Sequence, residues 1–419
     1  MDTDRAASGA SAEVPFRVFA VSDLHTDMRA NMEWVQGLST SAHLQDVAII
    51  AGDITDKLEI LEETMQLLVD RFAHVFFTPG NHDLWCRGTA RSASENSLGK
   101  LAQILSMCAR LGVHTGPYRI PASGSQRACW IVPMLSWYHA SFDDEPDIEY
   151  LQLPPVEHVV RDFSSCTWPE HLKLHDDGVA QHLDLMNEHM DAMTSEGLMS
   201  GDELYEFIQN SGEAVVSFSH FLPRVELLPE KRYLFFPNLA KVVGSNMLRS
   251  RVERLKPDVH LFGHTHFGWD QTLDGIRYIQ AALAYPRERK ARKLSLTIGT
   301  APEELQCIYN SSDGGHFADQ LSAQWSDFYQ TNKRDPLNME LASWVRPQYQ
   351  AQVEKWEQSR ASRQAWSRSS SEEHSLHVLG IGGSDSRSSG SGDALLSKTR
   401  AHQLNVRAQL ASTSSLVAR

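Results

Sequence analysis

Several Asp, Asn and His residues follow directly after short apolar runs of the sequence, and such side chains bind transition-metal ions. These residues are Asp23, His25, Asp53, Asn81, His82, Asp83, His220, His264 and His266. Carboxylate, carboxamide and imidazole ligands favour Mn, Fe, Zn or Ni over the oxygen cages of Ca or Mg. A carboxylate has two oxygens, so one such residue can bridge two ions that clamp a phosphoryl group together. The residue types therefore predict a site for two divalent ions.

The apolar runs before these residues have the length and composition of buried strands. They are residues 16–21, 47–51, 75–78, 214–219 and 259–262. Amphipathic helices are expected between them, at 58–72, 97–111, 177–193 and 240–255, and further strands at 128–135, 276–283 and 294–298. Alternation of strands and helices predicts parallel pairing with crossover helices. Because ligands bind at the carboxyl ends of parallel strands, we expect the polar residues to meet at one sheet edge.

Composition narrows the classes of protein that this chain can be. The 419 residues are 41% hydrophobic and 22% charged, which is typical of a folded α/β protein of one large or two to three smaller domains. A net charge of −14 disfavours proteins that coat nucleic acid or bind a membrane through basic patches. The five cysteines are widely spaced, and the N-terminus has no apolar signal segment. The sequence also has no apolar run long enough to cross a membrane. Together these features predict a cytoplasmic protein.

The pattern along the chain also predicts a division into segments. We expect a flexible N-terminus at 1–14 and an α/β domain at 15–300 that carries an insertion at 136–212. Residues 301–355 are expected to form an extension that packs on the core. Residues 356–419 are rich in Ser, Arg and Gly and predict a disordered tail, with a short helix possible at 394–410.

Five short motifs in this chain resemble the ordered motifs of the calcineurin-like metallophosphoesterase superfamily. They are Asp23-Leu24-His25, Gly52-Asp53, Gly80-Asn81-His82-Asp83, His220 and Gly263-His264-Thr265-His266, matching DxH, GD, GNH[DE], H and GHxH. The segments 77–85 and 136–139 are most similar to uncharacterised members from plants, algae and protists. The resemblance implies a four-layer α/β/β/α sandwich of two mixed sheets.

The resemblance also implies a role for each motif residue. One ion would be held by Asp23, His25 and His266, and the other by Asn81, His220 and His264. Asp53 would bridge the two divalent ions, which hold the attacking hydroxide between them. His82 would bind a phosphate oxygen and protonate the leaving oxygen, oriented by Asp83.

Departures from the family patterns limit the subclass. Ser/Thr protein phosphatases carry an Arg after the second and third motifs, whereas Lys57 follows Asp56 here and Leu84-Trp85-Cys86 precedes Arg87. Purple acid phosphatases need a Tyr ligand in the second motif, where this chain has Ile54-Thr55. A small phosphomonoester or phosphodiester is therefore favoured over a phosphoprotein, and the substrate stays unassigned.

Other residues allow two interpretations each. Singly, the Asp and Asn residues could be helix caps or turn residues, although five ordered motifs argue against this. Tyr138 and His139 could line a substrate wall or fill space as an aromatic plug, and Arg224 could approach the phosphate. The basic stretch 287–293 could bind an anionic partner or form a solvated turn, of which the turn is favoured.

The leading interpretation is a metal-dependent phosphohydrolase that acts on a phosphorylated small molecule. The alternative is a non-catalytic scaffold that has the same fold and binds proteins. The complete set of ligand residues argues against this alternative. A nuclease is disfavoured by the net charge. No membrane partner is expected, and a protein partner could bind through the C-terminal tail.

Overall fold

The computed structural model describes residues 15–87, 96–122, 124, 126–172, 177–191, 193–194, 197–291 and 301–376. These residues form two compact units. The larger unit comprises Met1–Asp144, Val160–Leu228 and Ala240–Arg334, and the smaller comprises Glu145–Val159, Pro229–Leu239 and Asp335–Arg419. The predicted boundaries at 300 and 355 do not coincide with the limits of these units. No helix among the described residues is long and apolar enough to cross a bilayer.

The first sheet of the larger unit has five strands in the order β13–β12–β1–β2–β3. Strands β1 (Arg17–Val21), β2 (Val47–Ala51) and β3 (His74–Thr78) are parallel neighbours. Strand β12 (Gln306–Asn310) pairs antiparallel with β1, and β13 (His316–Phe317) closes that edge. The sheet is therefore mixed.

The second sheet has six strands in the order β10–β11–β9–β8–β5–β4. Their bounds are Trp269–Leu273, Ile276–Gln280, Val259–Leu261, Ala214–Phe218, Cys129–Pro133 and Tyr118–Ile120. The four inner strands are parallel, and the edge strands β10 and β4 are antiparallel to their neighbours. A separate hairpin joins β6 (Met193–Thr194) and β7 (Gly197–Leu198).

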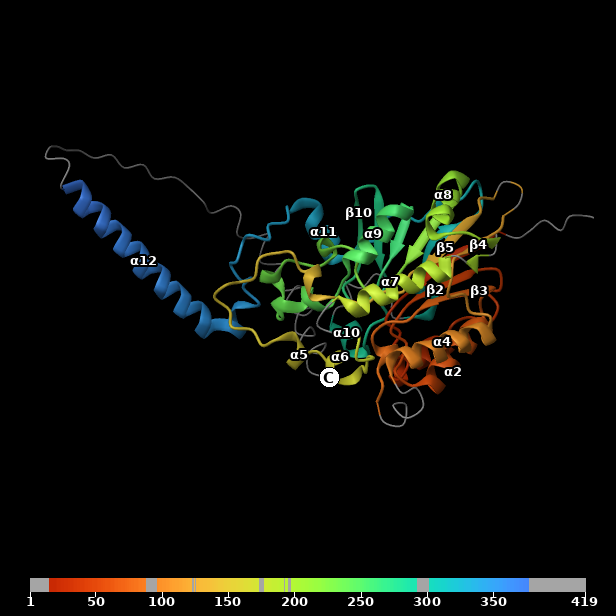
Figure 1. The fold of residues 1–419 in the computed structure, drawn as a ribbon. Helices are drawn as coiled ribbons and strands as arrows, with labels where there is room; N and C mark the ends of the chain where they lie inside the picture. The colour runs from red at the N-terminus through yellow and green to blue at the C-terminus, as the bar shows by residue number, and fades with distance from the viewer. Residues whose placement is uncertain are drawn as a thin grey trace, which may run out of the picture. The chain divides into compact units, whose positions relative to one another are not determined.

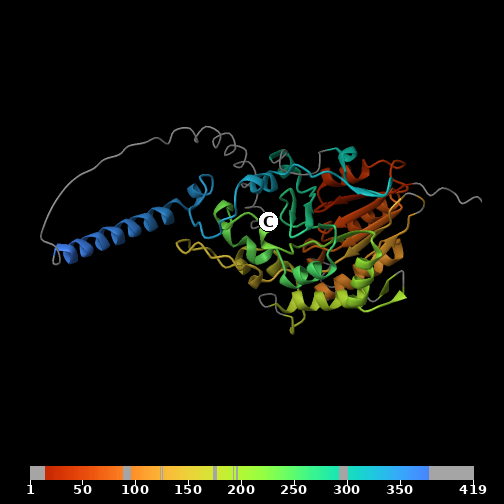
Figure 2. The same cartoon turned by 90° about the horizontal axis from the view of Figure 1, so that it is seen from above.

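The two sheets pack face to face through apolar side chains of strands that are buried along their length. One buried cluster contains Val18 and Ile49 from the first sheet together with Ile131 and Val216 from the second. The outer faces carry the helices α1 (Arg29–Gln36), α2 (Leu58–Val69), α4 (Ser97–Leu111), α7 (Gly178–Asp191), α8 (Gly201–Ser211) and α9 (Asn246–Leu255). Figures 1 and 2 show α2 and α4 beside the first sheet and α7–α9 beside the second. The four-layer sandwich predicted from the resemblance is confirmed.

Among the described residues, four further helices complete the set of α-helices outside α12. They are α5 (Val156–Val159), α6 (Asp162–Ser165), α10 (Pro286–Ala291) and α11 (Gln324–Thr331). The sequence did not predict α8, β4, β10 or β12. Strand β10 reads Trp-Asp-Gln-Thr-Leu, and such a mixed pattern gives no apolar run to detect. The strand expected at 294–298 and the helix expected at 394–410 lie outside the described residues.

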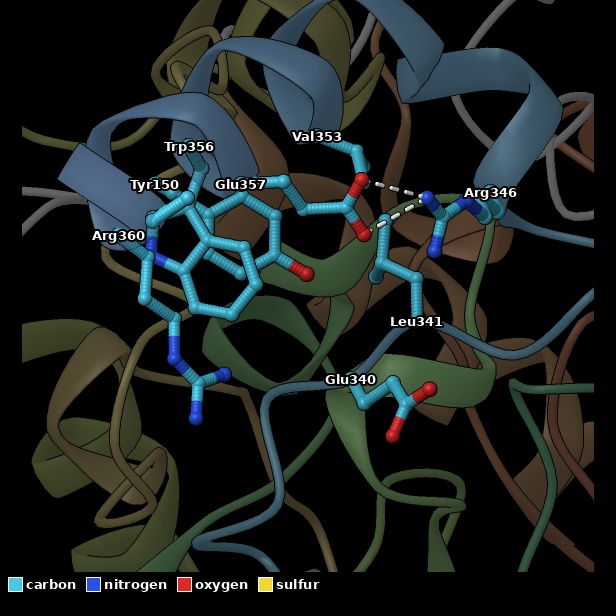
Figure 3. Close-up of a pocket in the computed structure, with 9 residues that line it drawn as sticks. Tyr150, Glu340, Leu341, Arg346, Val353, Trp356, Glu357 and Arg360 are labelled. Carbon is cyan, nitrogen blue, oxygen red and sulfur yellow. Dashed lines mark hydrogen bonds and ion pairs between the residues drawn. The ribbon is translucent and has the colours of Figure 1, made fainter. Parts of the chain in front are cut away.

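Helix α12 runs from Gln350 to Leu376, through the start of the segment for which disorder was expected. Its first turns are rich in Gln, Ala, Glu, Lys and Arg, which are strong helix formers, so local propensity accounts for the difference. Within the smaller unit, Trp356 of this helix stacks on Tyr150 with ring centroids 4.4 Å apart, and Arg346 pairs with Glu357. These side chains border a pocket of about 290 Å³ (Figure 3).

Candidate metal centre

The motif residues lie where parallel strands end, but the strands belong to two sheets. β1, β2 and β3 are neighbours in the first sheet and lead to the Asp23, Asp53 and Asn81 loops. β8 and β9 are neighbours in the second sheet and lead to His220 and His264. The expectation of one sheet edge is therefore corrected: the loops of two packed sheets meet, which brings together residues 241 positions apart such as Asp23 and His264.

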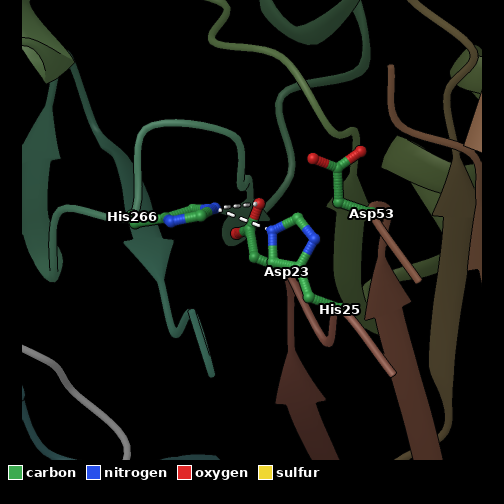
Figure 4. Close-up of side chains that lie close together, drawn as sticks. All are labelled: Asp23, His25, Asp53 and His266. Atoms are coloured by element: carbon green, nitrogen blue, oxygen red, sulfur yellow. Dashed lines mark hydrogen bonds and ion pairs between the residues drawn. The ribbon is translucent and has the colours of Figure 1, made fainter. Parts of the chain in front are cut away.

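The structure brings the predicted ligands into two overlapping groups of buried side chains. One group is Asp23, His25, Asp53 and His266, and the other is Asp53, His220 and His264. Within each group the ligand atoms all lie within 4.8 Å of one another. Figure 4 shows His266 directed at Asp23 and His25, which share one loop, with Asp53 on a neighbouring loop. Asp53 belongs to both groups, which is the arrangement expected of a bridging carboxylate.

The backbone of this site is strained. Positive φ angles occur at Asp23 (54°), His25 (42°), Asp53 (57°), His264 (74°) and His266 (55°). Such left-handed conformations cost free energy in non-glycine residues and cluster at functional sites. Hydrogen bonds between the loops hold them, because Asp23 N–H donates to Gly52 O (2.9 Å) and His25 N–H donates to Asp53 O (2.9 Å).

Two motif glycines are required by close contact rather than by catalysis. Gly52 has φ +81°, and a Cβ there would collide with the His220 ring. A Cβ at Gly80 would lie 2.8 Å from the Asp53 backbone nitrogen and would collide with the Asp53 carboxylate. The two glycines thus let three loops approach closely enough for their side chains to converge.

The hydrogen bonds of His220 and His264 fix which ring nitrogen carries the proton. His220 Nδ1 lies 2.9 Å from the carbonyl oxygen of Ala51, and His264 Nε2 lies 3.0 Å from the carbonyl oxygen of Val242. A carbonyl oxygen can only accept, so these nitrogens donate. Burial lowers the pKa of His220, and it lowers the pKa of His264 to about 3, so both rings are neutral. The remaining nitrogens of the two rings therefore carry lone pairs.

Those lone pairs converge on another acceptor, the side-chain oxygen of Asn81. His220 Nε2 lies 3.1 Å and His264 Nδ1 lies 3.0 Å from Asn81 Oδ1. The Asn81 amide is oriented by Asp162, whose Oδ1 accepts from Asn81 Nδ2 at 2.9 Å. Three electron-pair donors thus face one another without a proton between them, and a cation resolves this arrangement. The donor set fits a divalent metal ion.

In the first group, His266 lies between two carboxylates. Its Nδ1 donates to Glu288 Oε2 at 2.7 Å, and its Nε2 lies 3.3 Å from Asp23 Oδ1 and 3.1 Å from His25 Nε2. Burial by itself lowers the pKa of His266. The negative charges of Glu288 and Asp23 outweigh this effect and raise that pKa to about 9. A cation in this group would replace the proton on Nε2 as the partner of Asp23. The first group therefore also fits a divalent ion.

The shared carboxylate Asp53 experiences strong negative potential. Burial and the nearby charges of Asp83 and Asp23 raise its pKa well above the ordinary range. Its Oδ1 accepts from the His82 backbone N–H at 2.9 Å and lies 3.4 Å from His220 Nε2. Buried like charges need a counter-charge, and two divalent ions would supply it.

His82 lies beside the ligand groups with 15% of its side chain exposed, and its Nε2 is 3.9 Å from Asp53 Oδ2. The ring stacks on Trp85 with centroids 3.7 Å apart, and the Arg87 guanidinium lies over the ring of that Trp, 4.4 Å from its centroid. Burial and neighbouring histidines, His25 first, lower the pKa of His82 well below its usual value. The neutral ring can still donate a hydrogen bond to a bound oxygen.

Asp83, which was predicted to orient the His82 ring, accepts four hydrogen bonds from backbone N–H groups. Its Oδ1 accepts from Ile54 N–H (2.9 Å) and Thr55 N–H (3.0 Å). Its Oδ2 accepts from Asp53 N–H (2.9 Å) and Gly80 N–H (2.8 Å). Both oxygens are thus used in holding the Asp53 loop against its own loop, because backbone N–H groups converge on the carboxylate.

The three residues predicted to contact substrate each have partners within the protein. Tyr138 is 2% exposed and stacks on Trp137 at 5.3 Å, as expected of an aromatic plug. His139 is 1% exposed, and its Nε2 accepts from Asn246 N–H at 3.0 Å. Arg224 pairs with Glu226 and Asp274, so its guanidinium is not directed at the ligand groups.

Two acidic residues at the centre were missed by sequence reasoning. Asp162 accepts from Asn81 and also from Trp85 Nε1 at 2.6 Å, although it lies in the predicted insertion. Glu288 is 1% exposed and contacts His266, in the stretch interpreted as a solvated turn. That interpretation is wrong for Glu288 and for Arg289, which is 8% exposed, because both side chains are turned inward. Neither acid belongs to a motif that could have revealed it.

The chain matches the calcineurin-like phosphoesterase family over residues 16–268 and belongs to that family. It is thus a phosphoric ester hydrolase of a family that uses divalent metal ions. Among characterised proteins, it is similar to the acyl-carrier-protein phosphodiesterase PptH of Mycobacterium tuberculosis. The two are 26% identical over 309 residues, which cover 72% of this chain and 88% of that protein.

Two solved structures also align with the chain. The crystal structure of phosphopantetheinyl hydrolase (PptH) from Mycobacterium tuberculosis aligns at 21% identity and a TM-score of 0.49, covering 67% of this chain and 94% of that chain. A putative 5'-nucleotidase from Staphylococcus aureus aligns at 11% identity and a TM-score of 0.29, covering 64% of this chain and 48% of the other. The family assignment rests on the sequence match.

Proposed function

We propose that this protein hydrolyses a phosphodiester at a centre of two divalent ions that share Asp53. The observation that carries the proposal is the convergence of two buried donor groups on one carboxylate. The site would hold one ion through Asp23, His25, Asp53 and His266, and the other through Asp53, Asn81, His220 and His264. The mixed oxygen and nitrogen donors suit Mn, Fe, Zn or Ni.

When bound, the ions supply Lewis acidity and make water at the site nucleophilic near neutral pH. The residues of the chain position the reaction. Asp53 is shared by the two sites, while Asp83 holds the Asp53 loop through three backbone hydrogen bonds. His82, the partly exposed ring beside Asp53, donates a hydrogen bond to a phosphoryl or leaving oxygen. Its stacking on Trp85 restricts the ring to that direction.

The preference for a diester over a monoester has two supports. The mycobacterial relative is named as a phosphodiesterase, and the similarity covers most of both chains. In addition, Arg224, the cation expected to approach the phosphate, pairs with two carboxylates instead. A diester carries one negative charge and so requires less cationic compensation than a monoester. A phosphodiester carried on an acyl-carrier protein is the first natural substrate to test.

The test uses full-length protein stripped of metal and then given Mn, Zn, Fe or Mg. Hydrolysis of bis-p-nitrophenyl phosphate and p-nitrophenyl phosphate is measured, together with release of the prosthetic group from an acyl-carrier protein. We expect metal-dependent turnover that is faster with the diester and is lost in Asp53→Asn. The matched control is Asp144→Asn, since Asp144 is exposed.

Each outcome has a distinct meaning. Faster monoester hydrolysis would contradict the diesterase but keep the dinuclear centre. Absence of turnover with any metal, despite two ions bound per chain, would favour the non-catalytic scaffold. Retained turnover in Asp53→Asn would contradict the shared carboxylate.

A further inference from the structure

A short segment beyond the residues matched by the family packs against the first ligand group. The family match ends at residue 268, whereas helix α10 spans Pro286–Ala291. Glu288 of this helix is 1% exposed, and its Oε2 accepts from His266 Nδ1 at 2.7 Å and from Tyr285 N–H at 3.1 Å. A buried carboxylate therefore contacts the ring nitrogen of His266 that faces away from the ligand group.

Contacts of the next residue, Arg289, hold the helix that carries this carboxylate. Arg289 Nη1 donates to Asn31 Oδ1 at 2.7 Å and to Ala284 O at 2.9 Å. Asn31 in turn donates to Leu24 O at 2.6 Å, inside the motif that carries His25. The start of α10 is thus tied to the same loop that supplies two of the ligands.

Tyr285 completes the contact between α10 and the ligand group. Its ring stacks on the ring of His25, with centroids 4.3 Å apart and planes inclined by 21°. The ring also lies edge-on to His266, with centroids 5.2 Å apart. His25 and His266 are therefore both held from the α10 side, one by stacking and one by a hydrogen bond.

From this geometry we propose that Glu288 is a positioning residue for the metal ion bound by Asp23, His25, Asp53 and His266. The proposal rests on the metal centre proposed above. By accepting the Nδ1 proton of His266, Glu288 selects the tautomer whose Nε2 lone pair faces Asp23 and His25. A carboxylate behind a ligating imidazole also makes it a better electron-pair donor, and its removal commonly weakens metal binding 10- to 100-fold. The hydrogen bonds described for Glu288 come from His266 and Tyr285, neither of which belongs to the other group.

The test measures metal binding rather than turnover. Full-length wild type, Glu288→Gln and Glu288→Ala are stripped of metal and titrated with Co²⁺, and bound ions are counted by elemental analysis and by the visible absorption of Co²⁺. We expect two ions per wild-type chain. In the variants, one ion should bind about 10- to 100-fold more weakly, with the larger effect in Glu288→Ala, while the other ion is unaffected. Glu304→Gln is the matched control, because this glutamate is exposed.

The outcomes separate this proposal from the proposed function. A wild-type chain that binds no Co²⁺ would overturn the metal centre itself. Two ions bound with wild-type affinity in both variants would overturn the role of Glu288 alone. If Glu288→Ala does not fold, Glu288→Asp gives the decision. In this variant the carboxylate keeps its charge but lies one methylene further from His266. Metal affinity should therefore return toward that of the wild type. Equally weak metal binding in the Asp and Gln variants would contradict a role of the charge.

Discussion

Replacement of Asp83 by Asn tests whether one carboxylate holds the Asp53 loop in place. The four backbone N–H groups that Asp83 accepts come from Asp53, Ile54, Thr55 and Gly80. Asn has one side-chain oxygen, which can keep two of these bonds. Its amide group would then face the other two donors, and N–H cannot accept from N–H.

The expected loss of stability follows from those two donors. A buried donor left without an acceptor costs about 1–3 kcal/mol, so two cost about 2–6 kcal/mol. Removal of a buried negative charge offsets part of this cost, because burial raises the pKa of Asp83 to about 6 even though the backbone N–H groups lower it. We therefore expect Asp83→Asn to lower the free energy of unfolding by about 1–4 kcal/mol.

The assay is urea unfolding of metal-stripped protein, so that ion binding does not contribute to the measured stability. Asp144→Asn, which makes the same chemical change on the surface, is unfolded in parallel. Metal content is then measured after reconstitution, where Asp83→Asn should bind less because the Asp53 loop has lost its anchor. An unfolding midpoint and metal content equal to those of Asp144→Asn would refute the reasoning.

Three further predictions concern the same loops. Gly80→Ala should strongly reduce turnover and metal content, because the new Cβ would collide with the Asp53 carboxylate. Gly116→Ala is the control and should reduce neither, since the nearest atom to its Cβ would be 3.6 Å away. Equal metal content in the two variants would contradict the close-contact argument. Asp162→Ala should lower the free energy of unfolding by about 2–4 kcal/mol, measured by urea unfolding, since Asn81 and Trp85 both lose an acceptor. Removal of metal with a chelator should lower the melting temperature by several degrees, because ions bind the folded state, and an unchanged value would indicate that none had been bound.

Local patterns predicted the strand ends, whereas the two-sheet fold and the division of the ligands into two groups were implied by the resemblance of the five motifs. Each ligand follows an apolar strand within two to five positions, and parallel strands place their carboxyl ends together. What the pattern could not indicate was how many sheets supply those ends. That depends on the order in which strands pair, and β8 and β9 lie in a different sheet from β1, β2 and β3.

The residues behind the ligands were beyond local patterns for a different reason. Asp162 reaches Asn81 across 81 positions, and it lies in a segment whose composition resembles an acidic loop. Glu288 stands among Arg and Lys residues, so charge alone suggested a solvated turn. Its burial becomes favourable only through His266 and Tyr285, which the folded chain brings to it. Pairing of buried charges is a property of tertiary structure and leaves no periodic signal.

The strained backbone explains why these supporting residues are needed. Five residues of the ligand groups have left-handed φ angles, each costing about 1–2 kcal/mol for a residue other than glycine. The sum of about 5–10 kcal/mol is as large as the whole stability of many domains, so the loops would relax without other restraints. Asp83 and Asp162 provide those restraints through hydrogen bonds to backbone and side-chain donors, and Glu288 does so through His266. The acids around the centre therefore maintain a geometry that the ligand loops would not adopt by themselves.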